Sequence, residues 1–464
     1  MGLTNLAGVL CGRQEIELRK ATRIENFIYI WKVANSANMS FSDAREDMRN
    51  ARKEYDITFR TYYEKKVWKV SDEDRRKLGR KYNRYAKQLE EITGMTYGQA
   101  IETLKSAHNK YGVSAKDYVM YSFFDMDEEE QAQRAEKLSK KERNIEKIRA
   151  KNVRTVMKET GWSEAETIEE MNEARERCGA YYKNYCEYRF WELHPKTQDT
   201  YFNNSHINRL IRKYVTTPEK LIYFKNKRLF NENFSEFLGR RWTTSKDIDA
   251  EKLKETFSGC DKVMYKPVDL SRGKGIRIFE LNGENLEDVA EEMRRLPSGV
   301  VEEFITQHPA LADFSKGASV NTIRIMTILD NSKCYIPYVV IRLGHGKKPL
   351  DHMHFGGVIA PVDPDTGVIN HDPAGRDGTL YEKHPASGLV AKGFQIPYWD
   401  EVKRMVRRAS KRFPSVGFLG WDVAITDKGP VIVEANTYPS AASVQMPFIS
   451  EHKGVRPMFD RFLA

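Results

Sequence analysis

The chain has 464 residues, a net charge of +10, and a composition that is 40% hydrophobic and 11% aromatic. This length is too great for one ordinary core, so it predicts two or three domains, and the apolar content is sufficient to pack them. The basic excess favours anionic partners such as nucleotides, acidic sugars, nucleic acid or an anionic membrane surface. No run approaches the roughly 18 consecutive apolar residues of a transmembrane helix. The opening MGLTNLAGVLCGRQ is too short and too weakly apolar for a secretory signal.

The cysteines indicate a reducing compartment. They stand at positions 11, 178, 186, 260 and 334, their number is odd, and no two of them form a CxxC pair. Scattered cysteines of this kind act as small apolar residues in a reduced protein. We therefore expect the protein in the cytoplasm.

The chain changes character near residue 215. Before that point it is rich in Lys, Arg, Glu and Tyr, and runs such as EEEQAQRAEKLSKKERNIEKIRAKNVRTVMKE are typical of solvated helices. After about residue 260 it turns to β-branched runs punctuated by Gly and Pro, which are typical of strands and loops. The sequence therefore predicts a helical region over 1–215 and a second domain over 216–464.

Three segments of the helical region are similar to one another. They cover about 39–70, 95–126 and 162–193, and each predicts two helices, the second ending in aromatic residues. An ungapped alignment superposes three sets of residues: Ala51, Ala107 and Ala174; Tyr62, Tyr118 and Tyr185; and Trp68, Phe124 and Trp191. Packing in a core is the simplest role for the shared aromatic rings, and stacking on a base or a sugar is the alternative.

The first strands of the second domain carry a basic loop. Residues 263–281, VMYKPVDLSRGKGIRIFEL, predict a strand, a glycine-bearing loop and another strand, with Lys266 at the end of the first strand. Glycines in the loop 271–275 allow backbone N–H groups to approach an oxyanion closely. The loop is either a phosphate-binding loop or an ordinary basic hairpin turn.

The strand GVVEEFI, residues 299–305, ends in two carboxylates, Glu302 and Glu303. This pattern suits a hinge that holds a nucleoside, and two solvated acids are the alternative. Two further strands, SVNTIRIMTILD and CYIPYVVIRLG, carry Arg324 and Arg342. Either arginine could bind a phosphate or a carboxylate through two hydrogen bonds, or form an exposed salt bridge.

The stretch GWDVAITDKGPVIVEANTYPS, residues 420–440, predicts a hairpin of two apolar strands. Because alternate residues of a strand share a face, Asp422, Glu434 and Asn436 come to the same end of this hairpin. Three oxygen-bearing side chains on an apolar sheet suit Mg²⁺, which prefers such ligands. Solvated acids on an edge hairpin are the alternative. The absence of GxxxxGK[ST], HRD and DFG excludes P-loop NTPases and protein kinases.

These pieces resemble a known family. Lys266-Pro267 with the SRGKG loop, VEEFI, and the hairpin with EANTYPS are similar to the ATP-grasp superfamily. The narrower resemblance is to the sugar-transfer-associated ATP-grasp group, in QHP at 307–309, SVNTIRI at 319–325, FGGVIAPVDPDTG at 355–367, HPASG at 384–388 and GWDVAIT at 420–426. It covers about residues 220–450. The resemblance implies an α+β fold in which two α+β subdomains sandwich ATP, preceded here by an α-helical, repeat-like domain.

The resemblance also implies a role for each matching residue. Lys227 matches the first nucleotide lysine, with Lys225 as the fallback, and Lys266 matches the second. The remaining nucleotide contacts match Ser271, Gly273, Lys274 and Gly275 in the loop that closes over the phosphates, and Glu302, Glu303, Phe304 and Ile305 in the adenine hinge. The magnesium ligands match Asp422, Glu434 and Asn436. Arg324 and Arg342 fall where such enzymes hold the γ-phosphate or the acyl phosphate, and with Lys266 they are the expected catalytic residues.

Two departures from the family pattern concern the acceptor side and the metal ligands. Asp351-His352 stands where Asp-Asn is expected, and EAN replaces the commoner Glu-Gly-Asn, although Ala435 leaves the ligands intact. Four histidines lie in the loops between strands and are candidates for a base or for lining an acceptor pocket: His345, His352, His354 and His384.

The expected function is an ATP- and Mg²⁺-dependent, ADP-forming carboxylate–amine ligase that works through an acyl phosphate. The expected substrates are a carboxylate and an amine, one of them an acidic sugar or a cell-envelope polysaccharide precursor, with polysaccharide-synthesis enzymes as possible partners. Nucleic acid is not an expected partner. Two alternatives stay open: a kinase-like phosphoryl transferase of the same fold, and a nucleotide-binding scaffold without catalysis.

Overall fold

The computed structural model describes residues 28–55, 62–63, 66–69, 81–139, 141–270, 273–345 and 356–464. The chain forms two compact units, one ending at Val119 and the other starting at Met120. The second unit contains the third of the similar segments and all the strands of the described residues. The division of the chain at residue 215 stays a prediction.

The three similar segments have the same order of local structure. Each starts with a helix of 15 residues: α2 Phe41–Tyr55, α6 Tyr97–Tyr111 and α10 Glu164–Cys178. Short helices follow in the second and third segments: α7 Ala115–Met120 and α11 Tyr182–Glu187. Each segment then ends in a 3₁₀ turn: η1 Val67–Lys69, η2 Phe123–Asp125 and η3 Phe190–Glu192.

A residue in the left-handed region precedes each 3₁₀ turn at the same alignment position. The three residues are Lys66 (φ 49°), Ser122 (φ 55°) and Arg189 (φ 53°). Side chains other than glycine adopt this region at a cost, so the shared geometry reflects a shared local fold. The three aligned tyrosines are at most 4% exposed. Such burial supports core packing over stacking on a ligand for these rings.

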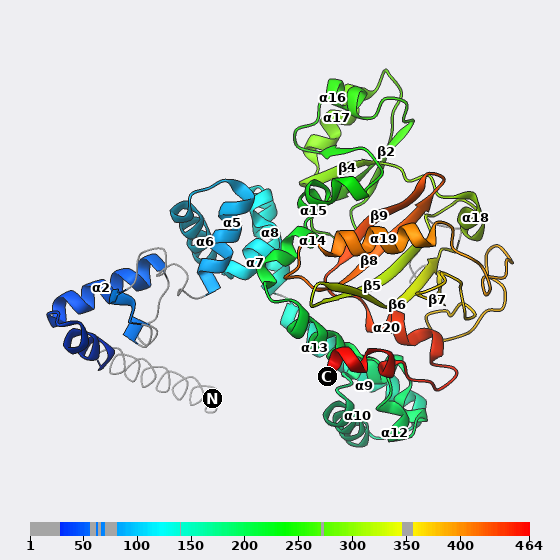
Figure 1. Ribbon diagram of the computed structural model, residues 1–464, viewed down its shortest axis with the longest axis horizontal. Coiled ribbons are helices and arrows are strands. Elements are labelled where there is room, and N and C mark those ends of the chain that lie inside the picture. Colours follow the sequence, from blue (N-terminus) through cyan, green and yellow to red (C-terminus); the bar gives the residue numbers. More distant parts are fainter. Residues whose placement is uncertain are drawn as a thin grey trace, which may run out of the picture. The chain divides into compact units, whose positions relative to one another are not determined.

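The smaller sheet has four antiparallel strands in the order β1-β4-β2-β3. They are β1 Trp242–Thr244, β2 Lys262–Pro267, β3 Arg277–Glu280 and β4 Gly299–Glu303. Helices α16 Ala250–Thr256 and α17 Leu286–Arg295 pack on this sheet around Tyr265, Phe279 and Met293 (Figure 1). The predicted strand–loop–strand over 263–281 and the strand over 299–305 are confirmed.

The larger sheet has five antiparallel strands in the order β7-β6-β5-β8-β9. They are β5 Thr322–Asp330, β6 Lys333–Leu343, β7 Val358–Val362, β8 Phe418–Thr426 and β9 Gly429–Asn436. The predicted hairpin is confirmed as β8–β9, which turns at Asp427 and Lys428. The central position of β5 buries all but the last of its residues.

Apolar layers cover both faces of the larger sheet. Helix α19 Trp399–Ser410 lies over one face, toward which Ile325 and Trp421 point (Figure 1). Helices α13 Asn204–Tyr214 and α20 Ala441–Gln445 pack on the other face, against Met326 and Ile328. Alternation along β5 therefore sends apolar side chains to both layers and places Arg324 on the second face.

The described part of the chain contains further helices and 3₁₀ turns. In the first unit there is α5 Lys81–Thr93; in the second there are α8 Glu128–Ser139, α9 Lys141–Thr160, α12 Pro195–Gln198, η4 Pro218–Leu221, α14 Ile222–Lys225, α15 Lys227–Phe234, η5 Ser235–Phe237, α18 Pro309–Ala312, η6 Asp313–Ser315, η8 Met446–Phe448, η9 Arg456–Phe459 and α21 Asp460–Leu463. No described helix combines the length and the apolar character needed to cross a bilayer. Cys178, Cys186, Cys260 and Cys334 are free thiols, and Cys11 lies outside the described residues.

Candidate functional site

The β8–β9 hairpin brings the three expected magnesium ligands together. Asp422 lies directly opposite Glu434, and Asn436 lies two residues farther along the same strand, so their side chains share one face. The Asn436 amide nitrogen is 3.3 Å from a carboxylate oxygen of each acid. Two carboxylates and an amide are a donor set that Mg²⁺ accepts, so these residues fit the ion. Their role as its ligands stays a prediction.

Asp422 is buried between two arginines. Arg324 of β5 donates two hydrogen bonds to its carboxylate, and Arg342 of β6 forms an ion pair with it. Burial alone would raise the pKa of Asp422, but the two guanidinium groups hold that pKa well below its usual range. The alternative of exposed salt bridges is wrong, because the two arginine side chains are only 9% and 12% exposed. The central strand β5 places Arg324 opposite Asp422, away from solvent.

The two expected nucleotide lysines lie near each other. Lys266 sits on β2 and is 15% exposed, and Lys227 is the first residue of α15. Burial lowers the pKa of Lys227, and Glu434 counteracts this effect while the positive charge of Lys266 adds to it. Lys227 Nζ donates to the Leu270 carbonyl at the base of the basic loop. The fallback, Lys225, instead places its Nζ 3.9 Å from the sulfur of Met120.

Glu302 is the point where several of these groups meet. It is buried, and its carboxylate accepts hydrogen bonds from Lys266 at 2.6 Å, Arg240 at 3.0 and 3.1 Å, and Asn231 at 2.8 Å. Burial alone would raise the pKa of Glu302, but Arg240 and Lys266 hold it well below its usual range. The alternative of a solvated acid is therefore wrong for Glu302. Its place in an adenine hinge stays a prediction, and in this structure the carboxylate orients Lys266.

The next residues of the expected hinge are partly exposed. Glu303 pairs with Arg241, whose guanidinium holds the pKa of the carboxyl below its usual value. Lys262 Nζ lies 4.9 Å from the centroid of the Phe304 ring, and Ile305 is half-buried. The strand thus turns its two acids to opposite sides, one into the site and one toward the surface.

The basic loop between β2 and β3 is described from Gly273 onward, and Ser271 lies outside the described residues. Gly273 and Gly275 both have φ of 71°, a conformation that favours glycine. A Cβ on Gly275 would also come within 2.9 Å of Pro267. Lys274, between the two glycines, is exposed. The loop therefore has the backbone and the free charge that contact with an anion would require.

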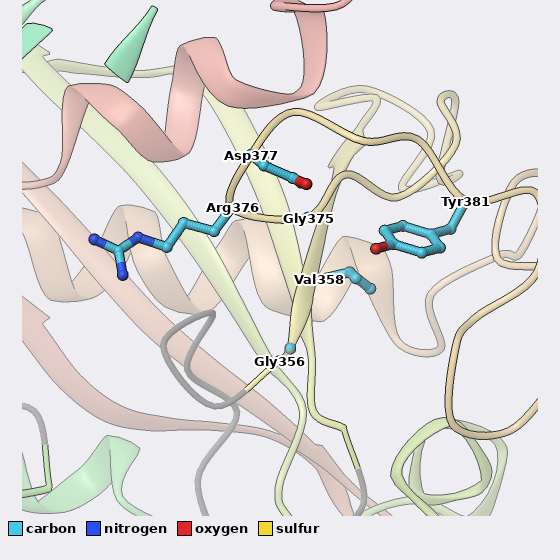
Figure 2. A pocket seen from close by; sticks show the side chains of 7 residues that line it. Gly356, Val358, Gly375, Arg376, Asp377 and Tyr381 are labelled. Atoms are coloured by element: carbon cyan, nitrogen blue, oxygen red, sulfur yellow. The ribbon is translucent and has the colours of Figure 1, made fainter. Parts of the chain in front are cut away.

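A pocket of about 410 Å³ lies at the start of β7 (Figure 2). Its labelled lining residues are Gly356, Val358, Gly375, Arg376, Asp377 and Tyr381. In the sheet, Val358 is paired with Leu343, the residue after Arg342. His345 adjoins the pocket, because a Cβ on Gly356 would lie 2.4 Å from its ring.

The other candidate histidines differ in their surroundings. His384 is 1% exposed and packs edge-on against Phe314, and burial lowers its pKa. His352 and His354 lie outside the described residues, as does the Asp351-His352 departure. Of the two candidates that the structure describes, His345 is therefore better placed than His384 for contact with a substrate.

Sequence reasoning missed two residues that hold the site together. Arg240 donates to Glu302 of the smaller sheet and to the carbonyl oxygens of Ile432 and Val433 in the larger sheet. Asn231 lies four residues after Lys227 on α15, a spacing that puts both on one face of the helix. That spacing was the only signal available for Asn231, and the GRRW run before β1 gave none that distinguished Arg240 from Arg241.

The chain was compared with protein families, with curated proteins and with solved structures. The family described as sugar-transfer associated ATP-grasp matches residues 193–458. No curated protein matches the chain. Similar solved structures include the ATP-grasp ligase PsnB complexed with a minimal precursor, at 15% identity, a TM-score of 0.32, and coverage of 54% of this chain and 62% of that one.

Two further solved structures are similar at the same level. The D-alanine–D-alanine ligase from Coxiella burnetii has 11% identity and a TM-score of 0.31, with coverage of 52% of this chain and 57% of that one. N5-carboxyaminoimidazole ribonucleotide synthetase from Thermotoga maritima has 12% identity and a TM-score of 0.30, with coverage of 53% of this chain and 55% of that one. The chain thus spans less than two thirds of the length of each.

The family match covers more than half of the chain and includes both sheets and the residues that converge between them. ATP and Mg²⁺ are the cofactors of ATP-grasp enzymes, and both lysines and the carboxylate pair lie inside the matched range. The protein belongs to the sugar-transfer associated ATP-grasp family.

Proposed function

We propose that the protein is an ATP- and Mg²⁺-dependent, ADP-forming carboxylate–amine ligase. The observation that carries this proposal is the convergence of two lysines, from α15 and β2, with carboxylates from both sheets. Lys227 and Lys266 lie near Glu302 and Glu434, and Glu434 is opposite Asp422 with its two arginines. Such a concentration of cations around paired acids suits the binding of a metal–nucleotide complex.

In the first step, a carboxylate oxygen of the acid attacks the γ-phosphorus of ATP, and the bond to ADP breaks. Lys227 and Lys266 would neutralise the phosphate charge, with Lys266 held in place by Glu302. Asp422, Glu434 and Asn436 would hold Mg²⁺, which supplies charge neutralisation on the phosphate oxygens. Arg324 and Arg342 stand beside Asp422, where they could meet the transferred group.

In the second step, the amine attacks the acyl carbon and phosphate leaves with the bonding electrons. The amine gives up a proton, and His345 beside the β7 pocket is the candidate acceptor. The basic loop, with Lys274 and its two glycines, would close over the phosphates and exclude the water that hydrolyses an acyl phosphate. No nucleophilic side chain is needed for this chemistry.

For the substrate we propose an acidic sugar or a precursor of a cell-envelope polysaccharide. The family description names an association with sugar transfer, and the net charge of +10 favours an anionic substrate. The pocket at the start of β7 is the proposed place for the acceptor. Enzymes of polysaccharide synthesis are the proposed partners, and the cytoplasmic location rests on the scattered free cysteines.

The test measures ADP and phosphate release from ATP with Mg²⁺ across a panel of acidic sugars, amino acids and amines, with mass spectrometry of the products. We expect release that depends on one acid–amine pair and a product whose mass equals the two substrates less water. Release should be lost in Asp422→Asn and in Glu434→Gln.

Other outcomes distinguish the two alternatives. A stable phosphorylated product without condensation would indicate a kinase-like phosphoryl transferase. ATP binding without turnover over the whole panel would favour the non-catalytic scaffold. A wild-type protein that binds no ATP would overturn the proposal.

A further inference from the structure

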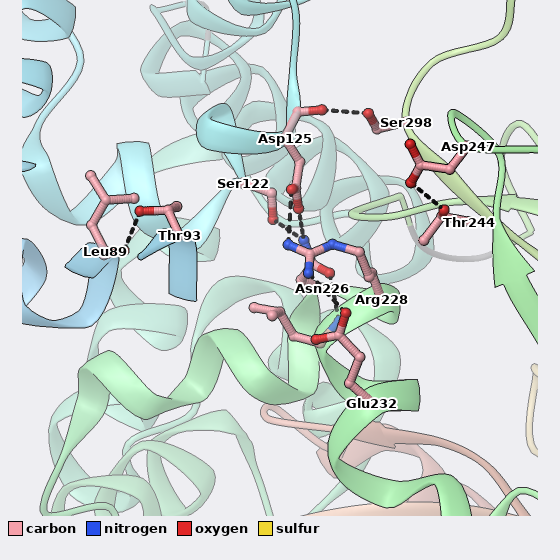
Figure 3. Close-up of polar contacts among 11 residues, drawn as sticks. Leu89, Thr93, Ser122, Asp125, Asn226, Arg228, Glu232, Thr244, Asp247 and Ser298 are labelled. Carbon is pink, nitrogen blue, oxygen red and sulfur yellow. Dashed lines mark hydrogen bonds and ion pairs between the residues drawn. The ribbon is translucent and has the colours of Figure 1, made fainter. Parts of the chain in front are cut away.

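The 3₁₀ turn of the second repeat-like segment reaches the start of the helix that carries Lys227 (Figure 3). Asn226 caps this helix by accepting a hydrogen bond from the Leu229 amide at 3.0 Å. The Asn226 side-chain nitrogen is directed back at the turn, where it donates to Ser122 at 2.9 Å and to Asp125 at 2.6 Å. Asn226 is fully buried, so the turn and the helix cap form one packed unit.

Asp125 binds both neighbours of Lys227. One carboxylate oxygen accepts from Asn226, and the other accepts from the Arg228 guanidinium at 2.9 Å (Figure 3). The backbone carbonyl of Asp125 accepts a further hydrogen bond from the hydroxyl of Ser298, next to β4. Because the residues before and after Lys227 are held by one carboxylate, the position of that carboxylate fixes how the lysine leaves the helix.

A second contact holds the base of the basic loop. Arg134 of α8 forms a two-fold ion pair with Asp269, and their side chains are 16% and 6% exposed. The carbonyl groups on either side of Asp269, those of Val268 and Leu270, accept hydrogen bonds from the backbone and the side chain of Lys227. The ion pair therefore fixes the strand end that both carries the loop and binds the lysine.

The equivalent position in the third segment has no such role. Glu192 aligns with Asp125, and the left-handed Arg189 aligns with Ser122. Glu192 pairs with Arg189 inside its own turn, where it is 32% exposed. The acid at this position therefore contacts the helix of Lys227 in the second segment, whereas in the third segment it pairs within its own turn.

We propose that Asp125 and Arg134 are positioning residues for the nucleotide, through which the turn Phe123–Asp125 and helix α8 set the orientation of Lys227 and hold its carbonyl partners Val268 and Leu270. This inference rests on the proposed function, because it requires that Lys227 and the loop bind ATP. It gives the helical region a part in nucleotide binding by the ligase.

The test compares the full-length variants Asp125→Asn and Arg134→Gln with the matched control Glu192→Gln. Calorimetry with ATP and Mg²⁺ gives the Kd, urea unfolding without nucleotide checks the fold, and steady-state kinetics gives kcat and the KM for each substrate. We expect the Kd and KM for ATP to rise about tenfold or more in both variants, because an ion pair or hydrogen bond to a charged group is lost. The KM for the acid should not change, and the control should bind ATP as the wild type does.

A charge-reversed double variant distinguishes a positioning role of the Arg134–Asp269 pair from a general effect on stability. In Arg134→Asp combined with Asp269→Arg, the reversed pair should recover most of the ATP affinity lost in Arg134→Gln, and this double variant decides the matter if the single variants do not fold. Unchanged ATP affinity in folded Asp125→Asn and Arg134→Gln would overturn the inference and leave the proposed ligase standing. A folded double variant without recovered affinity would also overturn it. A wild type that binds no ATP would overturn the proposed function itself.

Discussion

Asp422 couples the stability of the fold to pH. Its folded pKa is held below the ordinary value of 3.8 by Arg324 and Arg342. A carboxyl whose folded pKa is lowered stabilises the fold above its unfolded pKa, and this contribution is lost as the pH falls toward the folded value. The contribution is therefore complete at neutral pH and is lost progressively as the pH falls below about 4 toward the lower folded pKa.

Substitution of Asp422 by Asn should show this dependence. At pH 7 we expect the free energy of unfolding to fall by about 3–5 kcal/mol, because two buried arginines lose their counter-ion. The difference from the wild type should shrink as the pH drops from about 4 toward 3. Urea unfolding over this range measures it, with Asp400→Asn, an acid that is 79% exposed, as the control. A difference that stays constant from pH 7 to pH 3 would contradict the explanation.

At the level of elements, Arg240 links β4 of the smaller sheet to β9 of the larger sheet. Its side chain is 3% exposed, and it donates to Glu302 and to two carbonyl groups of β9. Arg240→Met should lower the free energy of unfolding by about 3–5 kcal/mol, because Glu302 stays buried with fewer partners. Its neighbour Arg241 pairs with Glu303 at the surface, so Arg241→Met should cost at most about 1 kcal/mol. If urea unfolding gave equal losses of free energy for Arg240→Met and Arg241→Met, burial would not explain a difference between the two ion pairs.

The conformation of Gly275, in the loop between β2 and β3, leads to a second prediction at this scale. Alanine at Gly275 would have to adopt a φ of 71° and would meet Pro267 at 2.9 Å. We expect Gly275→Ala to cost about 1–2 kcal/mol in the loop conformation and to raise the Kd for ATP correspondingly. Gly283→Ala is the matched control, because a Cβ there meets no atom within 4 Å. An unchanged Kd in Gly275→Ala would mean that this loop conformation is not the one that binds ATP.

At the scale of the whole molecule, the sequence predicts a domain that starts at residue 216, whereas the compact unit of the structure starts at Met120. The two boundaries predict different fragments that fold on their own. A fragment that starts at residue 216 would lose α8 to α13 and uncover Ile359, Met446 and Ile449, which pack against the third helical segment. We expect the fragment 120–464 to unfold cooperatively, and the fragment 216–464 to aggregate or to unfold without a sharp transition. Thermal unfolding followed by circular dichroism distinguishes them. A cooperative transition in 216–464 would support the boundary at 215 instead.

The local features of this protein follow from the sequence because they depend on neighbours along the chain. Alternation with a period of two predicts β5 and the β8–β9 hairpin, and turn residues mark where the hairpin reverses. The position of Asp422, Glu434 and Asn436 at one end of that hairpin is also local, since 14 residues separate Asp422 from Asn436. The family motifs, which stand on such local elements, identified the residues of the candidate site but could not test their roles.

The partners of those residues depended on the tertiary structure. Arg324 and Asp422 are 98 residues apart, Arg240 and Glu302 are 62 apart, and Asp125 and Asn226 are 101 apart. Which of several similar charges meet at such separations is decided by strand order and by how the helices pack, and no local pattern encodes that choice. Burial then decides the energetics, because a charge in the interior must have a partner whereas the same charge at the surface need not. The sequence alone therefore determined which residues could do the chemistry, and the tertiary structure decided which side chains orient them.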